Sequence, residues 1–274
     1  MYLRLNSMAN PVTHILFGTS PDAFYIGHGR RHHIQGMPEG FTKHAAALHI
    51  AMTLWISMTR DMQHWVLFNV ATNQFFHNTD IPPVIRDHLG GADGKVPADF
   101  LTFSDDPDPA HFFLKGKRHA SWSATLDDSL IQEILAQKRR VQGFDASVQG
   151  VLFGKGRTSL TMLPGGFIAR LDGDALDPGH ILNKTLTEFQ TGWAIERGST
   201  LCFYDHAYFF LKFKQQHGTT VQMRWNMPPH MMQILAELRE VTMGVEEQNL
   251  LMQDDEVAMG RARTRMEQSM RGNR

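Results

Sequence analysis

The segment from Ala110 to Leu135 contains an ordered set of features that recurs along most of the chain. It begins with the apolar triplet Phe112 to Leu114, passes through a basic turn to a strand with Trp122, and ends in an amphipathic helical segment. The segment from Tyr208 to Leu238 has the same order, with Trp225 in the place of Trp122. Such a recurrence constrains the fold, because repeated sequence is typical of repeated structure.

Three weaker copies of the motif lie elsewhere in the chain, and all five are spaced by roughly 41 to 49 residues. Spacings in this range are typical of solenoids, propellers and other arrays. A short apolar strand also precedes each copy. The first residues of the five copies, which we call anchors, are Phe24, Trp65, Phe112, Leu160 and Phe209.

Each unit is rich in short strands and ends in one short helix, so it differs from helical repeats, which show continuous three-and-four apolar spacing. Radial closure would leave few exposed sheet edges, whereas an open stack of small sheets needs caps that are not evident. We therefore predict a mainly β fold with short helices: five repeated modules in a five-bladed β-propeller-like single domain. The alternative is a chance pattern in an ordinary mixed, β-rich domain.

The expected domain covers residues 13–243, with modules at about 13–49, 50–95, 98–142, 148–190 and 198–243. The segment from Thr187 to Ser199 reads as an insertion, whose Trp193 could cap one face. Residues 244–274 are charged and lack aromatic residues. We expect them to form a helical or mobile C-terminal tail that mediates self-association.

The charges are balanced, with 27 Lys and Arg against 28 Asp and Glu. This balance argues against nucleic acid or an anionic membrane as the main partner. Cys202 is the single cysteine, so the chain cannot form an intramolecular disulfide, which favours a reducing compartment. No signal peptide or membrane span is evident, and we expect a soluble, cytoplasmic protein.

Histidines cluster in the segment from His28 to His33, but neighbours on a strand point to opposite faces, so His32 and His33 cannot both ligate one metal. No cysteine pair or metal-binding helix motif accompanies them. We therefore predict no metal site and no cofactor, and interpret the cluster as part of a basic turn.

Basic residues recur after the apolar triplets of three modules, where turns between strands are expected. If these turns surround one end of the molecule, they favour an anionic or polyhydroxyl ligand, because Lys and Arg donate hydrogen bonds. The strand tryptophans are first of all packing residues and, alternatively, platforms for sugar rings. Asp105 lies in an acidic turn and could accept hydrogen bonds from ligand hydroxyls. The candidate ligand-binding residues are Arg30, Arg31, Asp105, Lys115, Lys117, Trp122, Lys212, Lys214 and Trp225.

No nucleophile elbow, phosphate loop or dinucleotide fingerprint is present. If the protein is an enzyme, one central or inter-module pocket would have to use His32, Asp205 or His206 in acid–base roles.

The repeat number, repeat length and strand content over residues 13–243 resemble those of five-bladed propeller lectins of the tachylectin type, without a residue-by-residue motif match. The resemblance implies a multivalent protein whose partner is a glycan or another small molecule. A carbohydrate-binding protein is therefore the leading hypothesis for the function. An enzyme is the second, and a protein-interaction scaffold is the third.

Overall fold

The computed structural model describes residues 13–29, 31–47, 53–69, 74–89, 98–116, 120–122, 128–140, 147–218 and 220–240. These residues form a mainly β structure with short helices. All the strand pairs in the five small sheets are antiparallel. The expected mainly β class is therefore confirmed.

Four of the sheets have three strands each, in chain order. The first contains β1 (Thr13–Phe17), β2 (Phe24–His28) and β3 (Arg31–Gln35), and the second β4 (Thr53–Met58), β5 (Trp65–Asn69) and β6 (Gln74–His77). The third contains β7 (Ala98–Phe103), β8 (Phe112–Gly116) and β9 (Ala120–Trp122), and the fourth β10 (Gly150–Phe153), β11 (Ser159–Leu163) and β12 (Gly166–Arg170). In the fifth, β15 (Phe209–Gln215) pairs with β13 (Trp193–Ile195), β14 (Thr200–Leu201) and β16 (Val221–Asn226).

The strand registers place four of the five anchors at equivalent positions. In the fifth sheet we count β14, β15 and β16 as the first, second and third strands, although β13 precedes them. In every sheet the last residue of the first strand pairs with the first residue of the second. The pairs are Phe17 with Phe24, Met58 with Trp65, Phe103 with Phe112, Phe153 with Ser159, and Leu201 with Phe209. Four anchors thus match the prediction, and the equivalent residue in the fourth module is Ser159 rather than Leu160.

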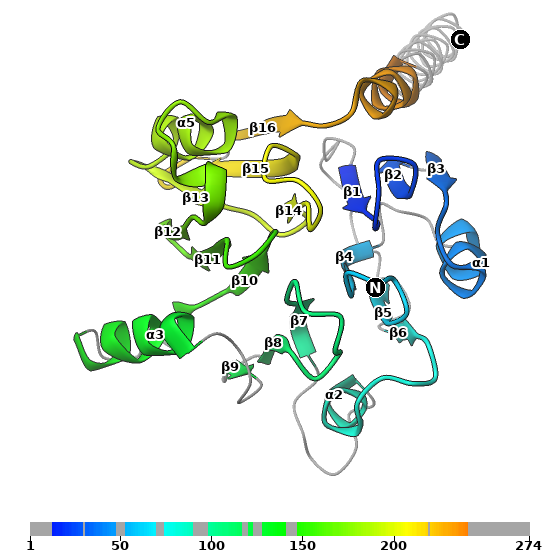
Figure 1. Cartoon of the computed structure of the whole chain (residues 1–274), viewed down its shortest axis with the longest axis horizontal. Helices are drawn as coiled ribbons and strands as arrows, with labels where there is room; N and C mark the ends of the chain where they lie inside the picture. The colour runs from blue at the N-terminus through cyan, green and yellow to red at the C-terminus, as the bar shows by residue number, and fades with distance from the viewer. Residues whose placement is uncertain are drawn as a thin grey trace, which may run out of the picture.

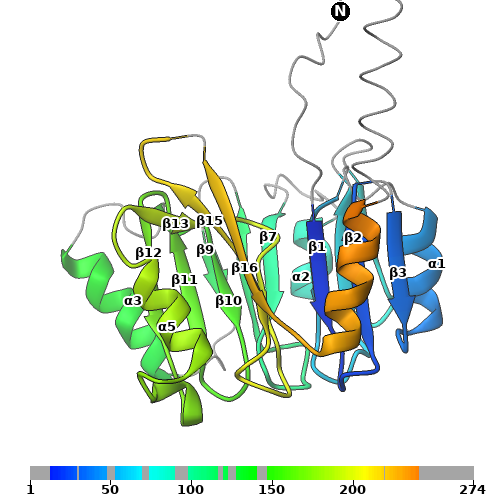
Figure 2. The same cartoon turned by 90° about the horizontal axis from the view of Figure 1, so that it is seen from above.

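The first strands of successive sheets lie against one another. β1 contacts β4, β4 contacts β7, β7 contacts β10, β10 contacts β14, and β14 contacts β1. Figure 1 shows these strands towards the middle of the molecule, with the helices outside them. In Figure 2 the axes of the labelled strands are roughly aligned. Because β2 and β8 are covered on both faces, their sequences are nearly continuous apolar runs instead of alternating patterns.

A helix follows the third strand of each of the first four sheets. The helices are α1 (Glu39–Ala47), α2 (Pro83–Leu89), α3 (Asp128–Arg140) and, after the short 3-10 helix η3 (Gly173–Leu176), α5 (Ile181–Glu188). Phe41 of α1 shows how such a helix packs, because its ring centroid lies 5.7 Å from that of Tyr25 in the first sheet and 5.7 Å from that of Trp65 in the second. The helix thus fills the space between two neighbouring sheets.

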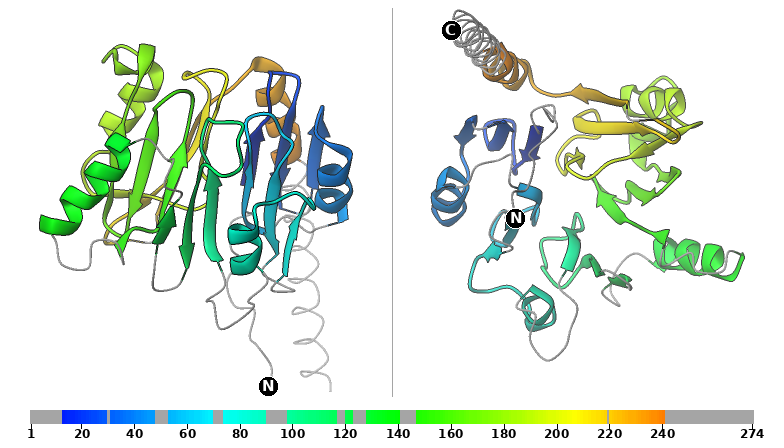
Figure 3. Two further views of the ribbon diagram at one scale, coloured as in Figure 1. Left: turned by 60° about the horizontal axis from the view of Figure 1, so that its bottom comes forward. Right: turned by 180° about the vertical axis from the view of Figure 1, so that it is seen from behind.

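The helical residues 229–240 do the same between the last sheet and the first (Figure 3). Met231 and Leu235 are buried together with Ile15 and Phe24 of the first sheet and Phe210 of the fifth. The two ends of the β structure therefore share one hydrophobic cluster.

Trp193 lies in β13, which pairs with β15, so the expected insertion supplies a strand of the fifth sheet. Cys202 is buried with its thiol reduced, and burial raises the pKa of that thiol to about 12. In the part of the chain that the structure describes, no helix is both long and apolar enough to span a membrane. The expected C-terminal tail, residues 244–274, lies outside the described residues.

Candidate functional site

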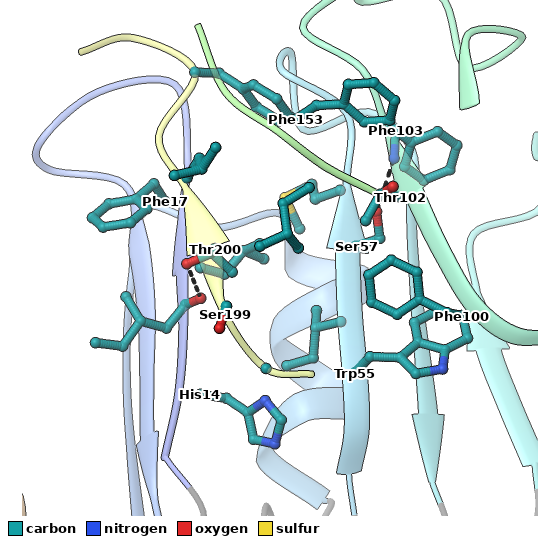
Figure 4. A pocket seen from close by; sticks show the side chains of 18 residues that line it. His14, Phe17, Trp55, Ser57, Phe100, Thr102, Phe103, Phe153, Ser199 and Thr200 are labelled. Atoms are coloured by element: carbon teal, nitrogen blue, oxygen red, sulfur yellow. Dashed lines mark hydrogen bonds between the residues drawn. The ribbon is translucent and has the colours of Figure 1, made fainter. Parts of the chain in front are cut away.

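A small cavity of about 50 Å³ lies between the first strands of the sheets (Figure 4). Its walls are mainly apolar, and polar side chains join neighbouring strands around it. The Ser57 hydroxyl accepts a hydrogen bond from the Phe103 amide at 3.1 Å, and the Thr200 hydroxyl donates one to the Ile15 carbonyl at 3.0 Å. Ligand pockets usually occupy several hundred Å³, so this cavity belongs to the packed core.

A larger cleft of about 480 Å³ lies where the turns after the first strands meet. We call it the turn cleft. Three arginines and one histidine face two aspartates around it, and Leu130 and Phe153 supply apolar surface. Its volume falls in the range typical of small-molecule sites. Its lining residues are Arg60, Ser104, Asp105, Asp106, Pro107, His111, Leu130, Phe153, Gly156, Arg157, Ser159 and Arg170.

The β7–β8 turn, which forms one wall of the turn cleft, is shaped by its own polar side chains. The Asp106 amide donates to the Ser104 hydroxyl at 3.2 Å. The Asp108 amide donates to the Asp106 carboxylate, and the Ala110 amide to the Asp108 carboxylate, both at 2.9 Å. Short Ser and Asp side chains favour such turns. The Asp105 carboxylate instead interacts with residues of the neighbouring turns.

Asp105 connects three turns. One carboxylate oxygen accepts a hydrogen bond from the Gly156 amide at 2.6 Å, and the other lies 3.4 Å from Arg60 Nη1. The Asp105 side chain is only 11% exposed, and burial raises the pKa of its carboxyl, although Gly156 and Arg60 oppose the shift. A carboxylate held in this way costs the folded protein stability, which is typical of a functional residue.

We expect Asp105→Asn to leave the protein at least as stable as the wild type at pH 7. The amide oxygen can still accept from Gly156, while the cost of burying a charge disappears. Since the pKa of Asp105 is raised on folding, its contribution to stability is full at low pH and is lost as pH rises through the folded pKa. Urea unfolding should therefore show the advantage of the variant at pH 7 and none below about pH 4. A clearly less stable variant at pH 7 would contradict this assignment.

The β10–β11 turn, opposite Asp105, is held by residues of the next two segments. Asp172 accepts a hydrogen bond from the Arg157 amide at 2.9 Å. The His206 ring contacts the Asp174 carboxylate through Nδ1 and the Lys155 carbonyl oxygen, at 3.0 Å, through Nε2. Both nitrogens of His206 are thus engaged, Nε2 with the β10–β11 turn and Nδ1 with η3.

The remaining candidate acid–base residues are separated from each other. His32 lies in β3 of the first sheet, where burial and His33 lower its pKa. Asp205 lies beside His206 in the β14–β15 turn, where its carboxylate accepts a hydrogen bond from the Ala207 amide at 2.8 Å. The structure does not bring these three candidate residues into one pocket. In the described ranges, no three His, Cys, Asp or Glu side chains are placed to hold a metal ion.

The expectation that Lys115 and Lys212 lie in turns between strands is wrong. Both are strand residues, in β8 and β15, and are only 5% and 8% exposed. Both lysines are buried because neighbouring elements cover both faces of β8 and β15 at these positions. Lys214 is exposed near the end of β15, and Arg31 is exposed at the start of β3. Arg30 and Lys117 lie outside the described residues.

The two candidate tryptophans lie on third strands, as expected. Trp225 of β16 is half-buried, with its ring centroid 6.4 Å from that of Phe210 and the Arg239 guanidinium 5.6 Å away. It therefore acts as a packing residue with one cation–π partner. Trp122 lies in β9, but its side chain is outside what the structure describes.

Of the residues that line the turn cleft, Asp105 was predicted from the sequence to bind a ligand, whereas Arg60, His111, Arg157 and Arg170 were not. The basic residues predicted to bind a ligand all follow the apolar triplets. Arg60 and Arg157 lie in the turns before the triplets, and Arg60 Nη1 lies 3.4 Å from the Asp105 carboxylate. A comparison of charges across all the first turns would have found both.

No protein-family model, no curated protein and no solved structure matches this chain. The function is therefore inferred from the turn cleft and its surroundings.

Proposed function

We propose that the five sheets are the blades of a five-bladed β-propeller. The equivalent registers support this, as do the contacts between successive first strands, including those between β14 and β1. The propeller lectins that the chain resembles lack such helices, and here α1 and residues 229–240 pack between neighbouring sheets. In this arrangement the turns after the first strands gather at one end, where the turn cleft lies.

We further propose that the protein binds a small, hydroxyl-rich anion, such as a sugar acid, in the turn cleft. The observation that carries this proposal is the grouping of Arg60, Arg157 and Arg170 around a cleft of about 480 Å³ that also contains Asp105 and Asp106. Arginines can bind a carboxylate with paired hydrogen bonds. The aspartates can accept hydrogen bonds from hydroxyls.

The apolar surface of the cleft suits the ring of such a ligand. Phe153 and Leu130 line the cleft together with the charged groups. A sugar ring has an apolar face that packs against aromatic carbon while its hydroxyls reach polar neighbours. A fully polar anion such as phosphate would leave this surface unused.

Binding is favoured over catalysis by the engagement of the candidate acid–base groups. His206 is used on both nitrogens, Asp205 holds its own turn, and His32 lies in another sheet. One site is favoured over several equivalent ones, because most of the charged lining comes from turns whose sequences differ between modules. The first turn, for example, contains Ser20 and Asp22 but no arginine.

Isothermal titration calorimetry with glucuronate and with glucose tests this proposal. We expect glucuronate to bind with a stoichiometry near one per chain and at least about tenfold more tightly than glucose, since charge-assisted hydrogen bonds contribute about 1.5–3 kcal/mol. Binding should weaken as salt rises, because the charges lie in an open cleft.

The variant Arg170→Gln should weaken glucuronate binding by about tenfold or more. Arg86→Gln is the matched control, because Arg86 is exposed on α2 and does not line the turn cleft. Undetectable glucuronate binding, or equal affinities of the two variants, would contradict the proposed function.

A further inference from the structure

Asp105 places a nearly buried carboxylate in the cleft for which we propose an anionic ligand. Its side chain is only 11% exposed, and one carboxylate oxygen accepts a hydrogen bond from the Gly156 amide at 2.6 Å. The other oxygen, Oδ1, is buried and accepts no hydrogen bond from the described residues, since Arg60 Nη1 at 3.4 Å lies beyond the usual hydrogen-bond length. A bound anion and the Asp105 carboxylate would therefore bring two negative charges into one cleft.

Arg60 is the cation that these two negative charges would share. Its side chain is 51% exposed and forms its ion pair with Asp105 from the β4–β5 turn. Because Arg60 also lines the turn cleft, an anion bound there would attract the same guanidinium. The charge of the anion would also disfavour the ionised form of Asp105, as a second negative charge nearby generally does. Both effects favour a protonated Asp105 in the complex.

The turns around Asp105 carry further charged groups that act on its protonation. Burial raises the pKa of its carboxyl, against the Gly156 hydrogen bond and the charges of Arg60, His206 and Lys155. Asp172 interacts with the neighbouring β10–β11 turn through the Arg157 amide. The other charged or titratable residues that line the cleft are Asp106, His111, Arg157 and Arg170.

We propose that the turn cleft binds its anion together with a proton from the solvent, which Asp105 takes up. This inference rests on the function proposed for the cleft and states how pH regulates that binding. A protonated Asp105 keeps one oxygen for the Gly156 hydrogen bond, and its hydroxyl becomes a hydrogen-bond donor. Arg60 then pairs with the ligand instead of with Asp105. Binding therefore tightens at acidic pH.

The sign of this pH dependence follows from the two states of Asp105. The pKa of its carboxyl is higher in the complex than in the free protein, because the ligand adds a negative charge. The affinity is therefore highest below the pKa of the free protein, falls as pH rises towards the pKa of the complex, and is constant above it. Glucuronate keeps its charge above about pH 5, since ordinary carboxyl groups titrate near about pH 4.

The test is calorimetry with sodium glucuronate at constant ionic strength, from about pH 5 to about pH 8, in pairs of buffers of different ionisation enthalpy. The wild type should bind at least about threefold more tightly at pH 5 than at pH 8, with an uptake of about 0.3 proton or more between them. Asp105→Asn replaces the carboxyl with a neutral group of the same shape. It should bind at pH 8 at least as tightly as the wild type, without proton uptake.

Two further variants assign the proton to Asp105. Asp22→Asn makes the same substitution at an exposed aspartate of the β1–β2 turn that does not line the cleft, and it should bind as the wild type does. His111→Gln removes the histidine of the cleft, whose Nδ1 lies 3.0 Å from the Asp106 carboxylate. The uptake should persist in this variant, whatever its affinity.

Carbon NMR of the Asp105 carboxyl in the wild type does not depend on the folding of any variant. Saturating glucuronate should raise the midpoint of its titration. Absence of glucuronate binding at every pH would contradict the function proposed for the cleft, and this inference with it. Binding with an unchanged midpoint, with uptake that survives in Asp105→Asn, or with uptake that disappears in His111→Gln overturns the proton linkage alone.

Discussion

Replacing Phe41 with alanine should lower the free energy of unfolding by about 3–5 kcal/mol, the usual cost of truncating a fully buried phenylalanine. Phe41 is 0% exposed and makes edge-to-face contacts with both Tyr25 and Trp65. These two rings belong to different sheets, so the substitution removes the side chain that joins them. The cavity cannot close easily, because each sheet is held separately by its own strand pairing.

The measurement is urea unfolding followed by circular dichroism and by tryptophan fluorescence. Lys43→Ala is the control in the same helix, since Lys43 is exposed and its loss should change stability by no more than about 0.5 kcal/mol. If Phe41→Ala lowers the free energy of unfolding by less than about 1 kcal/mol, α1 does not stabilise the packing between the first and second sheets.

The second large effect is expected at the other end of the chain. Met231→Ala should cost about 2–5 kcal/mol, because Met231 is 0% exposed in the cluster that joins the first sheet, the fifth sheet and the helical residues 229–240. The neighbouring Met232 is 39% exposed, and Met232→Ala should change stability by no more than about 0.5 kcal/mol.

Met231 and Met232 are the same residue type in the same helix. The two substitutions therefore differ in the burial of the side chain that is removed. Thermal and urea unfolding of the two variants therefore measure what this helix contributes to the cluster that joins the first and fifth sheets. Equal stabilities would show that this helix does not pack between the first and fifth sheets as described.

The repeat was predictable from sequence because the second strand of each sheet is buried on both faces. Phe112 and Phe209 are both first residues of such strands, and apolar runs bounded by turn residues mark these positions well. The fourth anchor was predicted one residue too late, at Leu160. The strand begins at Ser159, which is buried like its apolar neighbours but, being polar, does not read as the start of an apolar run.

The positions of charged groups were harder to predict. Lys115 and Lys212 look like turn residues because they follow apolar triplets, but their strands continue through them. The turn cleft combines Arg60, Asp105 and Arg170 from different modules, and only the packing of the sheets brings them together. No local pattern in the sequence reports such a grouping.

Closure of the five sheets is the central claim, and nuclear Overhauser effects measured on methyl-labelled protein test it most directly. We expect cross-peaks between the methyl groups of Ile15 and Met231, which share one buried cluster. We also expect cross-peaks between Thr200 and Ile15, whose side chain and carbonyl are hydrogen-bonded at 3.0 Å. Cross-peaks between the methyl groups of Leu16 in the first sheet and Leu67 in the second, which share another buried cluster, serve as the positive control. These control cross-peaks with none between the first and fifth sheets would contradict closure.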